Sequence, residues 1–297
     1  MILPKLRGVG TALITPFDAI GQVDLPAVRR LAARQIENGV DMLVPCGTTG
    51  EAVTLEETEF RQILETVVEV ADGRVPVIAG AGSNSTAKTI ASAKLAAECG
   101  VDAVLIVGPF YNKPTQEGYF QHFEAVAAAV DCGVVIYNVP GRTGGNISAE
   151  TQLRIAEFDN VIATKEASAN FSQIYDIVRG KPENFAVLSG DDDLALAQIA
   201  IGMDGIISVA SNEIPEEFSR MVHHAMDGEF AEAQEIHYRI VDLLRGNFME
   251  SSPIPVKTAM AMMGLIEERF RLPLVPIGKA NRGKLEDILR SLDLLRS

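Results

Sequence analysis

The sequence has no tryptophan, three cysteines, four histidines and no apolar run long enough to cross a membrane. Cys46, Cys99 and Cys132 form no CxxC pair, and their odd number argues against a disulfide framework. We interpret them as small buried residues of a protein in a reducing compartment. Residues 1–17 lack the continuous apolar segment of a secretion signal, so we expect a cytoplasmic protein without membrane contact.

Basic residues are scarce as well. The chain carries 26 lysines and arginines against 40 aspartates and glutamates, which gives a formal net charge of -14. Nucleic acids and anionic membranes would be repelled by such a protein, so we exclude them as partners. A small anionic substrate stays compatible with this charge if local groups bind it.

Metal catalysis has little support in the sequence. None of the four histidines lies in a HExxH pattern or near the end of a predicted strand. They are His122, His223, His224 and His237. The run Asp191–Asp193 follows a predicted strand and has oxygen ligands for Mg²⁺, but acidic residues also stabilise a helix N-terminus, and we favour that capping role.

Eight apolar, β-rich runs recur along the chain, and their starts lie about 28 residues apart on average, the length of a βα unit. The runs are 10–15, 42–47, 76–82, 103–110, 133–140, 161–167, 185–190 and 205–211. Helical patterns separate them. We predict an α/β fold, a (β/α)8 TIM barrel, in preference to an open doubly wound sheet, because candidate functional residues follow several different strands.

The pattern changes after residue 228. We predict a catalytic barrel over 1–228 and a small C-terminal helical domain over 229–297, where strand signals are missing and helical patterns cover 230–244, 253–263 and 279–295. We expect this domain to pack on the barrel or to serve in oligomer contacts.

Lys165 is the leading candidate for a functional residue in this sequence. It lies within the apolar run 161–167, and a lysine taken out of water has a lowered pKa and becomes a nucleophile. Strand alternation predicts that it shares a face with Val161, Ala163 and Ala167, small enough to leave room for a carbonyl compound. A Schiff base is the leading hypothesis; an edge-strand lysine that reaches water is the alternative.

The other lysines support this choice. Of nine, only Lys165 lies inside an apolar strand. The one competitor is Lys257, which we expect to begin a C-terminal helix outside the barrel.

Three further features follow predicted strands. The turn Gly47–Glu51 offers consecutive N–H groups and two hydroxyls for a carboxylate, or simply caps the next helix. Tyr137 shares an inward face with Val135 and Val139 and can pass protons to an amine, or is a packed ring. Arg142, in a glycine-rich loop, is either a clamp for a carboxylate or a surface residue.

Four segments together resemble the dihydrodipicolinate synthase family of the N-acetylneuraminate lyase superfamily, the class I pyruvate aldolases. They are Gly10–Phe17, Gly47–Glu51, Tyr137–Gly144 and Lys165–Ala167. The resemblance spans nearly the whole chain and implies a (β/α)8 barrel with C-terminal helices, usually a homotetramer built as a dimer of dimers. The implied reaction condenses pyruvate with L-aspartate 4-semialdehyde on the diaminopimelate route to lysine.

The resemblance also implies roles for individual residues. Lys165 forms the imine with pyruvate, without any other cofactor, and Thr49 with neighbouring amides holds the pyruvate carboxylate. Tyr137 donates and accepts protons in a relay with Thr48 and with Tyr111, which in the family reaches in from the partner subunit.

The resemblance also implies which residues select the second substrate. Arg142 would receive the carboxylate of the semialdehyde, and Gly190 and Ile207 match positions that line the pocket. Sugar-acid and sialic-acid lyases of the superfamily generally lack the Gly-Arg-Thr-Gly loop, so such an aldolase is the alternative, and a non-catalytic barrel is a third. Ser252 departs from the asparagine that the family often has before Pro-Ile-Pro-Val-Lys.

Regulation by lysine varies in the family. Lysine-sensitive relatives have histidine after the threonine turn, a carboxylate four residues past the position of Asn84, and a tyrosine before the relay tyrosine. Here residues 51–60 contain no histidine, and Lys88 and Phe110 occupy the other two positions. Since an amine effector would meet the like charge of Lys88, we expect insensitivity to lysine.

Overall fold

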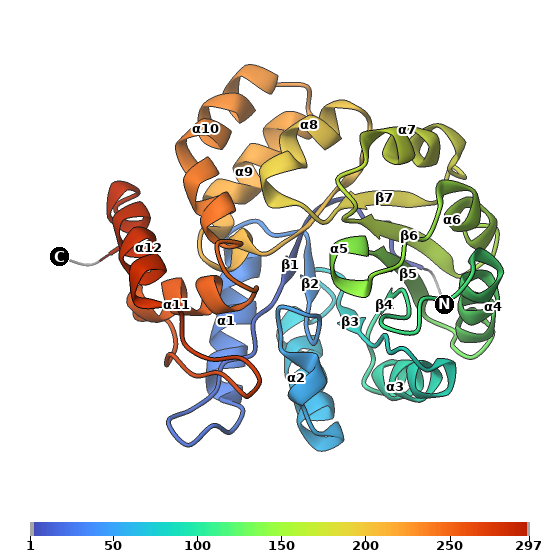
Figure 1. The fold of residues 1–297 in the computed structure, drawn as a ribbon, viewed down its shortest axis with the longest axis horizontal. Helices are drawn as coiled ribbons and strands as arrows, with labels where there is room; N and C mark the ends of the chain where they lie inside the picture. Colours follow the sequence, from blue (N-terminus) through green and yellow to red (C-terminus); the bar gives the residue numbers. More distant parts are fainter. Residues whose placement is uncertain (1–2, 296–297) are drawn as a thin grey trace.

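The computed structural model describes residues 3–295 and contains eight parallel strands surrounded by helices (Figure 1). The strands are β1 Gly8–Ala12, β2 Met42–Val44, β3 Ile78–Gly80, β4 Ala103–Val107, β5 Gly133–Asn138, β6 Val161–Glu166, β7 Ala186–Ser189 and β8 Gly205–Ser208. Each falls within a predicted run, except that β1 begins two residues earlier than expected.

The sheet closes on itself. Hydrogen-bonded neighbours follow the order β2-β1-β8-β7-β6-β5-β4-β3. A parallel bridge between Leu43 and Val77 joins β2 to the segment before β3, and Leu43 N–H donates to the Pro76 carbonyl at 2.9 Å. The predicted closed barrel is therefore confirmed, and an open doubly wound sheet is wrong.

The helices connect and cover these strands. They are α1 Leu25–Glu37, α2 Glu57–Ala71, α3 Thr86–Glu98, α4 Gln116–Ala127, α5 Pro140–Thr143, α6 Ala149–Ile155, α7 Phe171–Gly180, α8 Ala195–Ala200, α9 Pro215–Met226, α10 Phe230–Gly246, α11 Ile254–Met262 and α12 Lys279–Ser291. Three single 3₁₀ turns, η1 Ala52–Thr54, η2 Asp192–Leu194 and η3 Ala210–Asn212, follow strands β2, β7 and β8.

Local capping sets where two helices begin. Helix α2 begins at Glu57, because Glu56 and Glu59 form a reciprocal capping box there. Helix α4 begins at Gln116, because the Thr115 side chain accepts from the Gly118 N–H.

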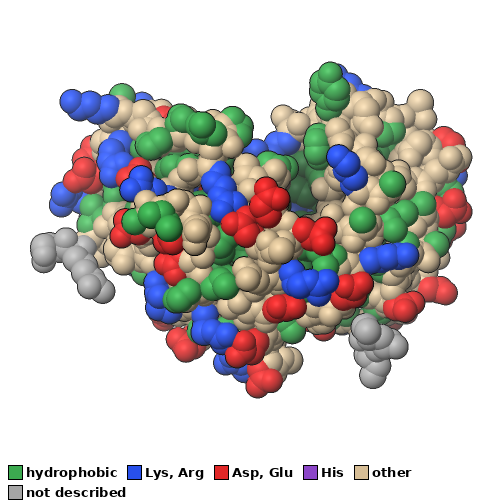
Figure 2. Space-filling view, turned by 90° about the horizontal axis from the view of Figure 1, so that it is seen from below, with side chains coloured by type: hydrophobic (Ala, Val, Ile, Leu, Met, Phe, Trp, Pro, Cys, Tyr) green, Lys and Arg blue, Asp and Glu red, His purple; other side chains and the backbone are tan. Residues whose placement is uncertain are grey.

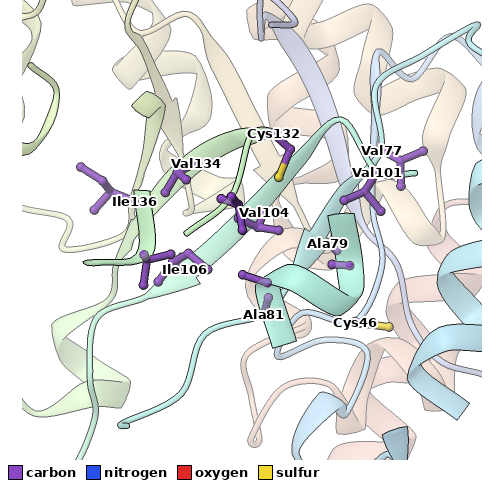
Figure 3. Close-up of a cluster of buried hydrophobic side chains, with 14 of the residues drawn as sticks. Cys46, Val77, Ala79, Ala81, Val101, Val104, Ile106, Cys132, Val134 and Ile136 are labelled. Atoms are coloured by element: carbon purple, nitrogen blue, oxygen red, sulfur yellow. The ribbon is translucent and has the colours of Figure 1, made fainter. Parts of the chain in front are cut away.

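Each strand buries both faces. One cluster fills the barrel interior and includes Val135, Tyr137 and Ile207. A second lies between the strands and the helices, where Cys46 and Cys132 pack with valine, alanine and isoleucine side chains (Figure 3). All three cysteines are free and buried, as predicted. Burial on both faces is why the strands read as continuous apolar runs.

The C-terminal helices pack on the barrel. Their side chains, such as Leu243 and Leu285, share one hydrophobic cluster with Val9 of β1 and Phe218 of α9. The division into 1–228 and 229–297 stays a prediction, and residues 1–2 and 296–297 lie outside the described part.

The surface mixes both charge signs. Acidic and basic side chains are interspersed over the face shown in Figure 2. Across residues 3–295, the structure has no helix that is both long and apolar enough to pass through a membrane.

Candidate active site

Lys165 lies near the carboxyl end of β6 and is 6% exposed. Ala163 and Ala167 flank it on the barrel interior, as predicted. The prediction for Val161 is wrong: Val161 packs in the outer layer, and Ile162 points inward instead. The pairing of β5 with β6 shifts register at this end of the strand, and such a shift moves side chains to the opposite face.

Burial makes the Lys165 amine reactive. Loss of water lowers its pKa to about 8, although the nearby carboxylates of Asp192 and Asp191 partly oppose the shift. The positive charge of Arg142 adds to the lowering. The amine therefore deprotonates near neutral pH, as a nucleophile in imine formation requires.

Tyr137 is the nearest aromatic group to this amine. Parallel pairing places it opposite Lys165 on β5, and the Lys165 Nζ atom lies 4.6 Å from the centre of its ring. Burial raises the pKa of Tyr137 to about 12, and Arg142 and a hydrogen bond with Thr48 oppose that shift. The phenol is therefore protonated at neutral pH and can donate a proton next to the amine.

The turn after β2 carries both threonines. Thr49 is buried and Thr48 is exposed. The turn is tight, since Gly50 N–H donates to the Gly47 carbonyl at 3.1 Å and Glu51 N–H to the Thr48 carbonyl at 3.1 Å.

Close backbone approach holds this turn against β3. A Cβ atom on Gly80 would lie 2.3 Å from the Cys46 carbonyl oxygen, so only glycine fits there. On the other side, the Thr15 hydroxyl donates to the Gly50 carbonyl at 2.7 Å.

A cavity of about 250 Å³ opens beside these groups, and Thr48, Tyr137 and Arg142 are part of its wall. Among the described residues, Lys165, Thr49, Gly190 and Ile207 lie outside that wall. Tyr137 is thus the residue that contacts both the lysine and the cavity.

Arg142 lies on α5, a single helical turn where we expected a glycine-rich loop. Pro140 begins the turn, and Gly144 ends it at φ 74°. The Arg142 Nη2 atom lies 3.4 Å from the Ser252 carbonyl oxygen. The guanidinium is exposed and available to an anion in the cavity.

Gly190 lies directly against the lysine side chain, and Ile207 belongs to the barrel interior. A Cβ atom on Gly190 would lie 3.0 Å from Lys165 Cε and 2.5 Å from Ala167 Cβ, so a glycine here leaves the lysine side chain free. Ile207 is buried on the inner face of β8.

Tyr111 is a predicted site residue that lies largely in solvent. It is 88% exposed, with a left-handed backbone at φ 72°. Its N–H donates to the Thr143 carbonyl at 3.2 Å.

The run Asp191–Asp193 lies at a helix N-terminus, as predicted, with Asp191 at the N-cap of η2. Neither η2 nor α8, however, receives a side-chain hydrogen bond as a cap from this run. Asp192 is instead buried and accepts from the backbone N–H groups of Val209 and Ala210, after β8, at 3.1 and 2.8 Å. Tertiary partners replace the local ones here.

Sequence reasoning also missed the buried carboxylate beside the lysine. Glu166 faces the outer layer, where side-chain amides of Asn138, Gln152 and Gln173 donate to it at 2.8 to 3.2 Å. Its only signal was an acidic residue within an apolar run. These bonds tie β5 to β6 directly behind Tyr137 and Lys165.

Reactive groups of barrel enzymes lie at the carboxyl ends of the strands, and here a buried lysine, a phenol and a threonine turn meet at that end. The fold and the site together define a (β/α)8-barrel enzyme built around a lysine.

Comparisons with known proteins agree. The model of the dihydrodipicolinate synthetase family matches residues 5–292. A 4-hydroxy-tetrahydrodipicolinate synthase of Koribacter versatilis is 53% identical over 294 residues, which cover 99% of this chain and 98% of that protein. The dihydrodipicolinate synthase structure of Aquifex aeolicus has 44% identity and a TM-score of 0.95 and covers 98% of this chain and 100% of its own.

A third relative was solved with a substrate of its reaction. The dihydrodipicolinate synthase of Acinetobacter baumannii, complexed with pyruvate, is 39% identical with a TM-score of 0.95 over 97% of this chain and 99% of its own. The chain belongs to the dihydrodipicolinate synthetase family, and its activity is that of 4-hydroxy-tetrahydrodipicolinate synthases, which are lyases. The resemblance drawn from four sequence segments is confirmed.

The pKa of Lys165 predicts the pH dependence of its reaction. Because only the free amine attacks a ketone, we expect imine formation at low pyruvate to rise about tenfold per pH unit below the pKa of about 8 and to level off above it. Asp191→Asn should move this limb to lower pH, because the Asp191 carboxylate stabilises the ammonium. Trapping with cyanoborohydride across the pH range measures both effects; a rate independent of pH would contradict them.

Proposed function

We propose that Lys165 forms an imine with pyruvate and that the imine carries the condensation with L-aspartate 4-semialdehyde. The neutral amine attacks the ketone carbon, and the ketone oxygen leaves as water after it takes up two protons. The protonated imine draws electrons from the methyl carbon, which loses a proton and attacks the aldehyde as an enamine. The observation that supports this best is the buried Lys165 amine against the Tyr137 ring.

Tyr137 and the threonine turn serve the pyruvate end of the reaction in this proposal. Tyr137 passes protons to and from the pyruvate oxygen, and the exposed Thr48 hydroxyl, which lines the same cavity, extends this relay. Thr49 and the amides of its turn hold the pyruvate carboxylate. Pyruvate in the Acinetobacter baumannii relative supports this substrate.

Arg142 serves the second substrate. Its guanidinium lines the cavity on an otherwise acidic protein and is suited to bind the semialdehyde carboxylate. A sugar-acid aldolase on the same scaffold would place hydroxyl groups there, which a guanidinium fork at this position does not favour.

The role proposed for Tyr111 requires an assembly of several subunits. We infer that the exposed Tyr111 ring enters the site of a partner subunit and completes the proton relay there, within a homotetramer. Val53, 87% exposed, adds a second apolar side chain that contact with a partner would cover. A relative of 42% identity is described as a monomeric variant, so assembly differs among related chains.

The remaining proposals concern location and domain structure. Three buried free thiols suit a reducing compartment, and we propose that the enzyme works in the cytoplasm. We also propose that residues 229–297 form a helical domain that depends on the barrel, since they share its hydrophobic cluster.

The imine itself can be trapped. Incubation with pyruvate and borohydride, followed by digestion, should place a reduced adduct on the peptide that contains Lys165, and Lys165→Met should abolish it. Lys257→Met, assayed at saturating pyruvate, is the matched control, because it removes the other buried lysine and should leave the adduct on Lys165 in place. An adduct on Lys257, or none, would refute the proposal.

The role of Arg142 predicts an effect confined to one substrate. Arg142→Ala should lower kcat/KM for the semialdehyde by about 100-fold, since a charge-assisted contact is lost, while the trapped imine with pyruvate, measured on the high-pH plateau, forms at a nearly normal rate. Steady-state kinetics with each substrate varied, together with sugar-acid aldehydes as competitors, measures this. A preference for a sugar-acid aldehyde would favour the alternative aldolase.

Lysine should not inhibit this enzyme. Lys88 is exposed beside Asn84, and Phe110 stands before Tyr111, so an amine effector would meet like charge without a phenol to bind it. In a coupled assay, we expect activity to stay constant up to millimolar lysine. Lys88→Glu is the informative variant, and strong inhibition of the unmodified enzyme below about 1 mM, a binding free energy of about 4 kcal/mol, would contradict the expectation.

A further inference from the structure

Lys257 is completely buried outside the barrel and takes no part in the proposed reaction. Its Nζ atom forms an ion pair with the Glu51 carboxylate, whose side chain is 1% exposed. The same nitrogen lies 4.3 Å from the centre of the Phe17 ring. Burial lowers the pKa of Lys257, and the Glu51 charge opposes this shift. A buried pair of charges adds little net stability, so its position calls for another explanation.

Glu51 is the last residue of the threonine turn. Its backbone is left-handed at φ 53°, which a residue other than glycine keeps only where its surroundings hold it. One carboxylate oxygen of Glu51 binds Lys257, and the other accepts from the Arg271 N–H at 3.1 Å. Both partners lie more than 200 residues further along the chain. The turn with Thr48 and Thr49 is therefore anchored at its end by the C-terminal region.

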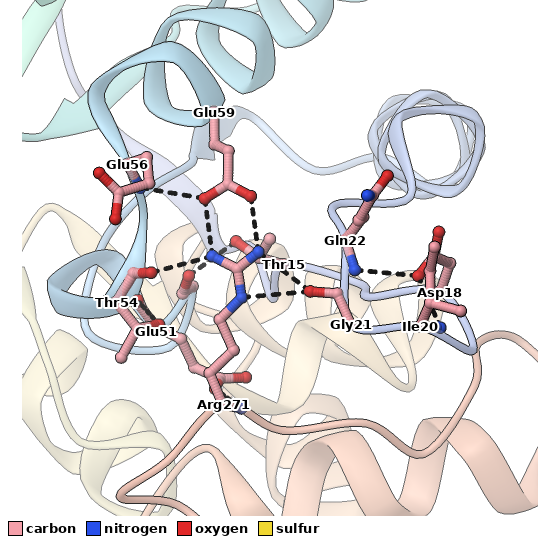
Figure 4. A network of polar contacts seen from close by, with 11 residues as sticks. Thr15, Asp18, Ile20, Gly21, Gln22, Glu51, Thr54, Glu56, Glu59 and Arg271 are labelled. Atoms are coloured by element: carbon pink, nitrogen blue, oxygen red, sulfur yellow. Dashed lines mark hydrogen bonds and ion pairs between the residues drawn. The ribbon is translucent and has the colours of Figure 1, made fainter.

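Arg271 extends this anchor to the segment after the turn (Figure 4). Its guanidinium donates to both carboxylate oxygens of Glu59 at 2.6 Å and to the Thr54 carbonyl at 2.9 Å. It also donates to the Gly21 carbonyl at 3.0 Å and lies 4.4 Å from the centre of the Phe17 ring. This bidentate pair has a defined geometry, so it holds the start of α2 in one place.

The same C-terminal stretch reaches the other side of the cavity. The Ser252 carbonyl, just before α11, accepts from Arg142. Residues 252–271, which we name the anchoring segment, thus contact the turn that carries the threonines and the arginine opposite it.

We infer that the anchoring segment positions the two substrate-binding elements, and that Lys257 and Glu51 are positioning residues for the pyruvate end of the site. Lys257 acts through Glu51, and Glu51 sets the N–H groups and hydroxyls of Thr48 and Thr49. The inference rests on the role proposed for Thr49 in holding the pyruvate carboxylate.

Kinetics of near-isosteric variants test this inference. Lys257→Met and Glu51→Gln should each raise KM for pyruvate about 10- to 100-fold, because a displaced turn binds the carboxylate less well. The semialdehyde KM should change by less than about threefold, since Arg142 is held by a backbone carbonyl. The double variant should be no worse than either single one, as expected of two residues that act as a pair. Lys257→Arg, which keeps the charge, should recover much of the loss.

Arg239→Met is the matched control. It removes another cation of the C-terminal region, paired with Glu217 of α9, outside both the turn and the anchoring segment. Its kinetic constants should stay within about twofold of the unmodified enzyme. Thermal melts of all variants show whether each is folded; where Lys257→Met is not, Glu51→Gln gives the result.

The possible results distinguish a positioning role of the Lys257–Glu51 pair from a purely stabilising one. An unchanged pyruvate KM in folded Lys257→Met and Glu51→Gln would show that the pair serves stability alone, and an equal rise in Arg239→Met would do the same. Borohydride trapping on the unmodified enzyme is run in parallel. If that enzyme forms no adduct on Lys165, the proposed function fails, whereas a normal adduct with unaffected variants overturns only the positioning role.

Discussion

The site depends on one constraint: the ammonium of Lys165 has been removed from water inside a closed ring of strands. A charge in such a place is unfavourable, so the amine gives up its proton at a pH where an exposed lysine would keep it. The same burial acts in the opposite sense on Tyr137, whose phenol keeps its proton. One environment thus places an amine that loses its proton near pH 8 against the ring of a phenol that keeps its proton, a pairing suited to imine chemistry.

The rest of the barrel serves to maintain that environment. Burial of both strand faces allows a lysine inside and, one residue later, a carboxylate on the outer face satisfied by three side-chain amides. Gly190 leaves space beside the lysine side chain. The carboxylates of Asp191 and Asp192 limit how far the lysine pKa falls. At this end of the barrel, the residues that pack around Lys165 are therefore also the residues that set its pKa.

Predictions from local sequence patterns were correct where the local sequence by itself determines the structure. The eight apolar runs located the strands, because two-sided burial leaves a direct record in the sequence. Lys165 stood out since a cation within such a run has no local explanation. Where the prediction failed, a distant partner decided: the shifted pairing of β5 with β6 turned Val161 outward, and the backbone after β8 took Asp192 away from helix capping.

The sequence by itself therefore determined the strands, the lysine within an apolar strand and the family. Tertiary structure decided which groups hold the threonine turn and Arg142. The Glu51–Lys257 pair joins residues 206 positions apart, and the Arg142–Ser252 contact joins residues 110 apart. Nothing in either local pattern signals such partners, because hydrogen bonds and ion pairs form between groups that folding brings together, whereas periodicity records only which side of an element is buried.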